Sequence, residues 1–70
     1  MGSVQWVYAN GCNWITLDGS AQNHIEALWK QNTSAWVSCK AFPSSAVYVD
    51  IAQMALFCNG FAYTIARRRS

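Results

Sequence analysis

The chain begins with alternating apolar and polar residues, as in a β-strand that is buried on one face. Val4, Trp6 and Tyr8 fall on the same side of this stretch. Asn10-Gly11 is a strong signal for a tight turn, and residues 14–17 resume the extended pattern after it. The sequence therefore predicts a β-hairpin.

The next segment changes to the period of an amphipathic helix. Its apolar residues recur at i, i+4, i+7 and i+8, which forms one stripe: Ala21, Ile25, Leu28 and Trp29. Asp18 or Ser20 can cap the start of this helix, which we expect over about Ser20–Gln31. The polar residues expected to point away from the core are Gln22, Glu26 and Lys30.

The remainder of the chain returns to strand patterns. Val47, Val49 and Ile51 alternate with Tyr48 and Asp50, so the two sets are expected on opposite faces. Turns are expected at residues 43–45 and at Asn59-Gly60, and extended stretches at residues 35–39, 46–51 and 61–67, whereas residues 52–57 fit either a strand or a turn followed by a strand. A hairpin, one helix and a run of antiparallel strands indicate an α+β domain.

Composition supports one small domain with an aromatic core. A chain of 70 residues buries only about 60% of the surface that it exposes when unfolded. Four Trp, three Tyr and three Phe compensate, because each buried aromatic side chain removes roughly 150–250 Å² from water. We interpret residues 1–3 as an expression leader and residues 4–68 as a single domain.

The net charge of +2 comes from Arg67, Arg68 and Arg69. Without them, the chain has two lysines and three acidic residues. The chain therefore has no basic face for DNA, and the terminal arginines are expected to form a solvated chain end. The longest apolar run, residues 54–58, is too short to cross a membrane.

Cysteines stand at positions 12, 39 and 58, an odd number without the spacing of a zinc site. We expect buried free thiols, which indicate a reducing compartment, the cytoplasm or the nucleus. His24 and Glu26 match the start of a zinc deaminase signature, but its P-C-x-x-C part is missing. His24 is expected to be an ordinary exposed helix residue, and we expect neither catalysis, nor a cofactor, nor a metal.

Ligand binding is the better-supported class. Small curved sheets hold ligands between aromatic walls with a few polar groups. The candidate pocket residues are Tyr8, Tyr48, Gln53, Tyr63 and Arg67. The alternative is that these aromatic side chains only fill the core or the surface.

Three motifs resemble one known family in the expected order. Trp6 and Trp14 are followed by Asp18 and a helix, then by the motif at residues 49–54 (Val-Asp-Ile-x-x-Met), and finally by residues 65–68 (Ile-Ala-Arg-Arg). Together they cover residues 4–68 and resemble the WWE domain, most closely the divergent members in ADP-ribosyltransferases of the poly(ADP-ribose) polymerase superfamily. The resemblance implies a half-barrel of about six mostly antiparallel strands on one helix. It also implies a pocket for iso-ADP-ribose or terminal ADP-ribose.

The chain departs from the family at several pocket positions. Tyr8 matches a pocket tyrosine, and Trp6, Trp14, Leu28 and Trp29 are expected to be structural. The Glu of the family name, placed at Ala9, is missing. At two other pocket positions, Ile15 stands where the family has an aromatic residue and Tyr63 where it has an arginine. Val47 stands at the position of a tyrosine, with Tyr48 one residue away, and Leu56 stands at the position of a glutamine, with Gln53 nearby.

The resemblance therefore implies a non-catalytic, monomeric module of a multidomain ADP-ribosyltransferase. Its binding of ADP-ribose or poly(ADP-ribose) is expected to be weak or lost, because charge-assisted hydrogen bonds from Arg are the strong way to hold a pyrophosphate. The alternatives are a protein–protein or interdomain module whose pocket is filled by Ile15, Val47 and Leu56, or the WWE domain of a ubiquitin ligase.

Overall fold

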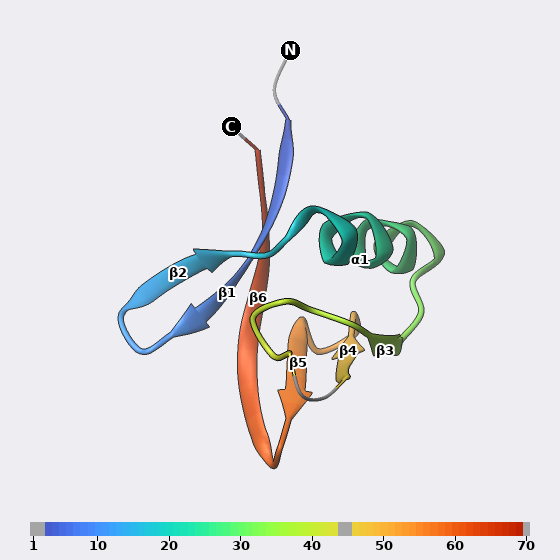
Figure 1. Cartoon of the computed structure of the whole chain (residues 1–70). Coiled ribbons are helices and arrows are strands. Elements are labelled where there is room, and N and C mark those ends of the chain that lie inside the picture. The colour runs from blue at the N-terminus through green and yellow to red at the C-terminus, as the bar shows by residue number, and fades with distance from the viewer. Residues whose placement is uncertain (1–2, 44–45, 70) are drawn as a thin grey trace.

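In the part of the chain that the structure describes, six strands form one open antiparallel sheet, and a single helix packs on it (Figure 1). The computed structural model describes residues 3–43 and 46–69. The elements in chain order are β1 (Val4–Asn10), β2 (Asn13–Thr16), α1 (Gly19–Gln31), β3 (Ala35–Val37), β4 (Val47–Asp50), β5 (Ala55–Cys58) and β6 (Phe61–Arg69). The strand order is β2-β1-β6-β5-β4-β3, and every neighbouring pair is antiparallel, which confirms the predicted α+β class.

Two hairpins of the sheet turn at or next to the predicted positions: the loop after β1 is Gly11-Cys12, one residue later than predicted, and the loop after β5 is Asn59-Gly60. Gly11 follows β1 with a φ of 62°, and Asn59-Gly60 joins β5 to β6 with φ values of 51° and 81°. A two-residue hairpin loop of the Asn-Gly kind needs positive φ at both residues, and only Gly adopts it without steric cost. Cys58 and Phe61 pair directly across this loop.

The helix begins and ends close to its predicted limits. Asp18 is its N-cap, and one carboxylate oxygen accepts a hydrogen bond of 3.2 Å from the Ala21 backbone N–H. At the other end, Asn32 adopts the left-handed conformation with a φ of 53°, which satisfies the last carbonyls of the helix. Ala21, Ile25 and Leu28 are buried, as the stripe predicts, but its fourth member, Trp29, is 40% exposed.

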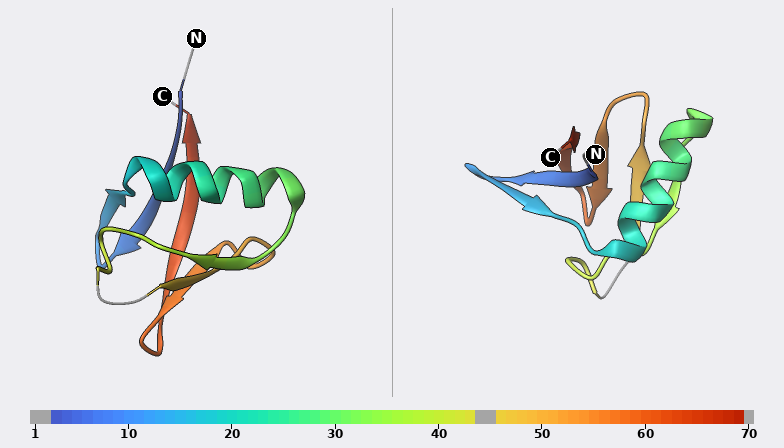
Figure 2. Two further views of the ribbon diagram at one scale, coloured as in Figure 1. Left: turned by 45° about the vertical axis from the view of Figure 1, so that its right-hand side comes forward. Right: turned by 90° about the horizontal axis from the view of Figure 1, so that it is seen from above.

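The core lies between α1 and one face of the sheet. Figure 2 shows from two sides how the helix lies along the sheet. Val47 and Val49 face this core, whereas Tyr48 and Asp50 lie on the other face, as their alternation predicts. The side chains that are fully buried and largest in volume are Trp6, Ile25, Leu56, Ile65, Val7, Val37, Val47 and Val49.

Several expectations are corrected. Residues 67–69 belong to β6, which pairs with β1 as far as Val4, and Arg67 is half-buried, whereas Arg68 and Arg69 are exposed as expected. Trp14 is not part of the core, because it lies on the edge strand β2 with 49% of its surface exposed. Residues 52–57 resolve as a turn followed by β5.

Two expectations lie partly outside the described residues. These are the leader, of which only Ser3 is described, and the turn at residues 43–45, of which only Pro43 is described. Within the described part of the chain, no helix is long and apolar enough to cross a membrane.

Candidate functional site

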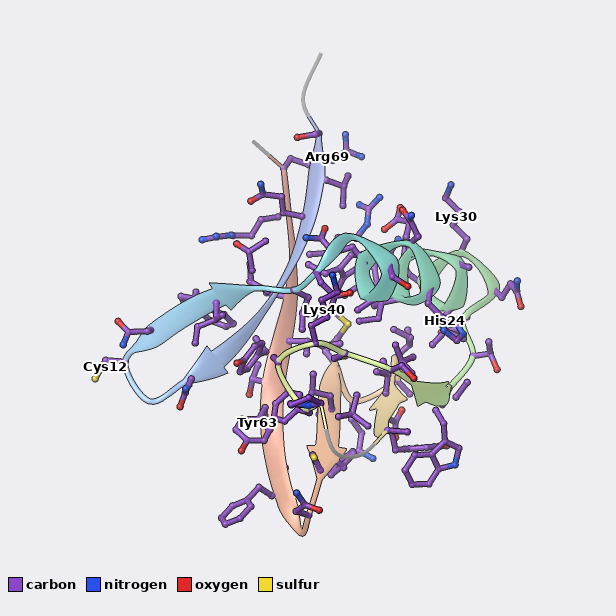
Figure 3. All side chains as sticks on the ribbon, viewed as in Figure 1. Cys12, His24, Lys30, Lys40, Tyr63 and Arg69 are labelled. Carbon is purple, nitrogen blue, oxygen red and sulfur yellow. The ribbon has the colours of Figure 1, made fainter. Side chains whose placement is uncertain are left out.

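Three aromatic rings meet on the core side of the sheet, and we call them the aromatic triad: Tyr8, Phe42 and Tyr63. The ring centroids are 5.4 Å apart for Tyr8 and Phe42, 5.4 Å for Phe42 and Tyr63, and 5.8 Å for the two tyrosines. These are the separations of directly interacting aromatic pairs. Figure 3 shows Tyr63 beside β6 at the level of the loop that follows β3.

The sheet register explains why the two tyrosines meet. Tyr8 pairs with Ile65 across β1 and β6, and Tyr63 lies two residues from Ile65 on the same face. Diagonal neighbours of this kind are within reach of aromatic side chains. Two of the five predicted pocket residues are therefore brought together by strand pairing.

Phe42 lies in the loop between β3 and β4, and no sequence pattern identified it as a candidate. Its backbone N–H donates a hydrogen bond of 3.1 Å to the carbonyl of Cys39, which forms a turn, and Cys39 itself is buried. The turn places the half-buried Phe42 ring against the core. Phe42 thus covers the two tyrosines.

Tyr48 does not join the triad. It pairs with Trp36 on one side and Phe57 on the other, in a register that runs without a bulge from Val47 to Asp50. Its ring is 5.3 Å from that of Trp36, on the face of the sheet opposite to the core. Because Tyr48 is one residue from Val47, its side chain lies on the opposite face of the strand.

Gln53 does not join the triad either. Its side-chain amide donates a hydrogen bond of 2.7 Å to one Asp50 carboxylate oxygen, and its backbone N–H donates one of 3.3 Å to the other. The same Asp50 carboxylate accepts a hydrogen bond from the Ser34 hydroxyl. Gln53 is exposed and closes the turn between β4 and β5.

Arg67, the fifth predicted pocket residue, forms a bidentate ion pair with Glu26. Its Nε donates to Glu26 Oε1 at 3.0 Å and its Nη2 donates to Oε2 at 2.7 Å. The guanidinium also lies 5.4 Å from the Trp29 ring, a cation–π distance. The two side chains of the ion pair are only 20% and 23% exposed. Arg67 is thereby held by the helix.

Glu26 and Gln22 were expected to point away from the core, and this expectation is wrong. Glu26 Oε1 accepts a hydrogen bond of 2.8 Å from the Trp6 indole N–H. Gln22 accepts one of 3.0 Å from the Trp6 backbone N–H and donates one of 2.8 Å to the Leu17 carbonyl. The polar side of α1 therefore contacts the start of β1 and the end of β6.

These contacts set the charge of the Glu26 carboxylate. The hydrogen bonds from Arg67 lower its pKa from 4.5 to about 2, with further help from the Trp6 hydrogen bond. The same contact raises the pKa of Arg67. Both side chains are charged at neutral pH, so Arg67 is committed to a carboxylate.

The lowered pKa of Glu26 predicts a loss of stability in acid. Between pH 4.5 and 2 the unfolded chain takes up a proton at residue 26 and the folded chain does not, so unfolding becomes easier as the pH falls. We expect Glu26→Gln to remove this part of the pH dependence in urea unfolding measured from pH 6 to pH 2. An unchanged slope in the variant would contradict the assignment.

Two cavities lie away from the aromatic triad. One of about 370 Å³ is lined by Asp18, Ser20, Ser38, Cys39, Lys40 and Pro43, and one of about 120 Å³ by Val4, Trp6, Gln22, Asn23 and Glu26. In the larger, the Asp18 carboxylate already accepts a hydrogen bond of 2.9 Å from the Lys40 backbone N–H, which lowers its pKa. Burial raises the pKa of the Cys39 thiol to about 11, so this thiol is not a ready nucleophile.

The other cysteines and His24 match expectation only in part. Cys39 and Cys58 are buried as expected, but Cys12 is exposed at the tip of the β1–β2 hairpin (Figure 3). His24 is exposed on α1, as predicted. Among the described residues, no group of three or more His, Cys, Asp or Glu side chains is placed to hold a metal ion.

Three residues that depart from the pocket pattern implied by the resemblance pack into the core: Ile15, Val47 and Leu56. Val47 and Leu56 are fully buried, and Ile15 is half-buried against the same cluster. Comparison of the chain with protein-family models, with curated proteins and with solved structures gives no match.

Proposed function

We propose that the chain is a non-catalytic recognition module of the WWE type, belonging to a multidomain ADP-ribosyltransferase, with only weak affinity for ADP-ribose. The observation that carries the proposal is the contact between Tyr8 and Tyr63 on the core side of the sheet. Two tyrosine rings at nearly right angles on neighbouring strands form a corner in which a flat base can pack.

The contacts of Glu26 add support. The resemblance requires two Trp and a Glu, and the position assigned to the Glu holds Ala9. Glu26 offers a carboxylate from the helix instead, and it accepts a hydrogen bond from the first of the two tryptophans, Trp6. The six-stranded curved sheet with one helix is also the layout that a WWE half-barrel would have.

The same geometry explains why the affinity is expected to be weak. Phe42 already packs on both tyrosines, and Arg67 is committed to Glu26. A pyrophosphate would therefore lack its strongest partner, and each charge-assisted hydrogen bond is worth about 1.5–3 kcal/mol. We expect a Kd for ADP-ribose on the order of 1 mM.

Nuclear magnetic resonance titration with ADP-ribose and iso-ADP-ribose tests the proposal. We expect small chemical shift changes at millimolar ligand, clustered on Tyr8, Phe42 and Tyr63. Ribose 5-phosphate, which lacks the base, should give none of them. Absence of shifts at saturating ligand, or shifts centred on the cavity beside Cys39, would contradict the proposal.

A second function, contact with a protein or a neighbouring domain, is favoured by the outer face of the sheet. Trp36, Tyr48 and Phe57 form a cross-strand aromatic row there, and Trp36 is 64% exposed. This row lies on the face opposite to the aromatic triad. Titration with a neighbouring domain of the parent protein would shift the Trp36 indole signal in this case, and ADP-ribose would leave it unchanged.

A further inference from the structure

We infer that Phe42 occupies the position of a flat heteroaromatic ring, so that the chain carries a latent base-binding site closed by its own side chain. The inference rests on the proposed function, because the ligand class it names, adenine and similar rings, is that of the same site. The inference adds that Phe42 is the residue that limits the affinity for the base.

The first support is the position of the Phe42 ring. It lies 5.4 Å from both Tyr8 and Tyr63, and its plane makes an angle of 51° with each of them. The tyrosines themselves meet edge to face at 85°. Phe42 thus packs equally on two rings that form a corner, and a flat base could pack in the same corner.

The second support is the difference between the walls and the ring that covers them. Tyr8 and Tyr63 belong to β1 and β6, whose register continues from Val4 to Tyr8. Phe42 belongs to a loop, and the carbonyl of Cys39 holds its backbone N–H. Loss of the Phe42 ring is therefore expected to leave both walls in place.

The third support is the size and polarity of the space that would open. The triad packs against buried apolar residues, so removal of a benzyl group creates an apolar gap with two aromatic sides. An apolar cavity of about 150 Å³ is sufficient to bind benzene. Because Arg67 remains paired with Glu26, the higher affinity is expected to come from contacts with the base and not from contacts with the phosphates.

The test uses Phe42→Ala, with Phe61→Ala as the matched control. Phe61 is 66% exposed at the start of the same β6 strand that carries Tyr63, so its loss removes the same atoms from the surface. We expect Phe42→Ala to bind adenosine, ADP-ribose and indole at least tenfold more tightly than the wild type, with shifts at Tyr8 and Tyr63. Phe61→Ala should bind like the wild type, and ribose 5-phosphate should gain nothing.

Phe42→Leu keeps the inference testable if the alanine variant does not fold. Leucine preserves apolar packing but lacks the ring, and we expect about a threefold gain for the same three ligands. No gain for any of them in a folded variant would overturn the inference, as would an equal gain in Phe61→Ala.

The outcomes also separate this inference from the proposed function. If the wild type binds ADP-ribose weakly at the tyrosines and neither Phe42 variant binds it more tightly, the proposed function stands and the role of Phe42 is overturned. If Phe42→Ala binds indole but neither adenosine nor ADP-ribose, the site for a flat ring beneath Phe42 stands and the proposed function is overturned.

Discussion

Replacement of Trp6 with alanine is expected to lower the free energy of unfolding by about 3–5 kcal/mol, the cost of removing a large aromatic side chain from a core. Trp6 is 1% exposed, contacts the Trp29 ring edge to face and donates its indole N–H to Glu26. A domain of this length has a total stability of about 3.5–10 kcal/mol. Urea unfolding followed by tryptophan fluorescence and circular dichroism would measure the loss.

Trp36→Ala is the matched control for this prediction. Trp36 is 64% exposed on the outer face of β3, so its loss is expected to change stability by no more than about 0.5 kcal/mol. Trp6→Phe should fall between the two, because it keeps most of the packing but leaves the Glu26 carboxylate without the indole donor. Equal losses in Trp6→Ala and Trp36→Ala would contradict the assignment of Trp6 to the core.

The two hairpin tryptophans show what the sequence could and could not predict about the fold. Alternation identified both strands, and the Asn-Gly signals placed the two chain reversals to within one residue. Burial of Trp6 but not Trp14 depends on strand order, because β1 lies between β2 and β6 whereas β2 is an edge strand. That order arises from pairing between residues about 60 positions apart, as in Val4 with Arg69, which no local pattern encodes.

The candidate site shows the same division. Tyr8 and Tyr63 could be selected because each lies on a strand with a clear apolar face. Phe42 could not, because a loop has no period from which the direction of a side chain can be predicted. Glu26 was assigned to the solvent side of α1 by helical period alone, yet that side meets the start of β1 and the end of β6.

The network around Glu26 leads to the second large effect. Glu26→Ala is expected to cost about 2–3 kcal/mol, because it leaves the Trp6 indole and the Arg67 guanidinium without their acceptor. Glu26→Gln should recover part of the loss, since its amide oxygen can still accept from Trp6. His24→Ala, an exposed change on the same helix, is the control and should stay within about 0.5 kcal/mol of the wild type.

A double-mutant cycle with Arg67→Met separates the ion pair from the rest of the network. Arg67→Met is expected to destabilise the domain in the same direction, and the double variant Glu26→Ala with Arg67→Met should lose less than the sum of the single variants. The Trp6 indole remains unsatisfied in both variants that lack Glu26, so its contribution cancels from the coupling. Additive losses would show that Glu26 and Arg67 act independently. Arg67 would then be available to a phosphate, and the weak affinity expected for ADP-ribose would lose one of its two causes.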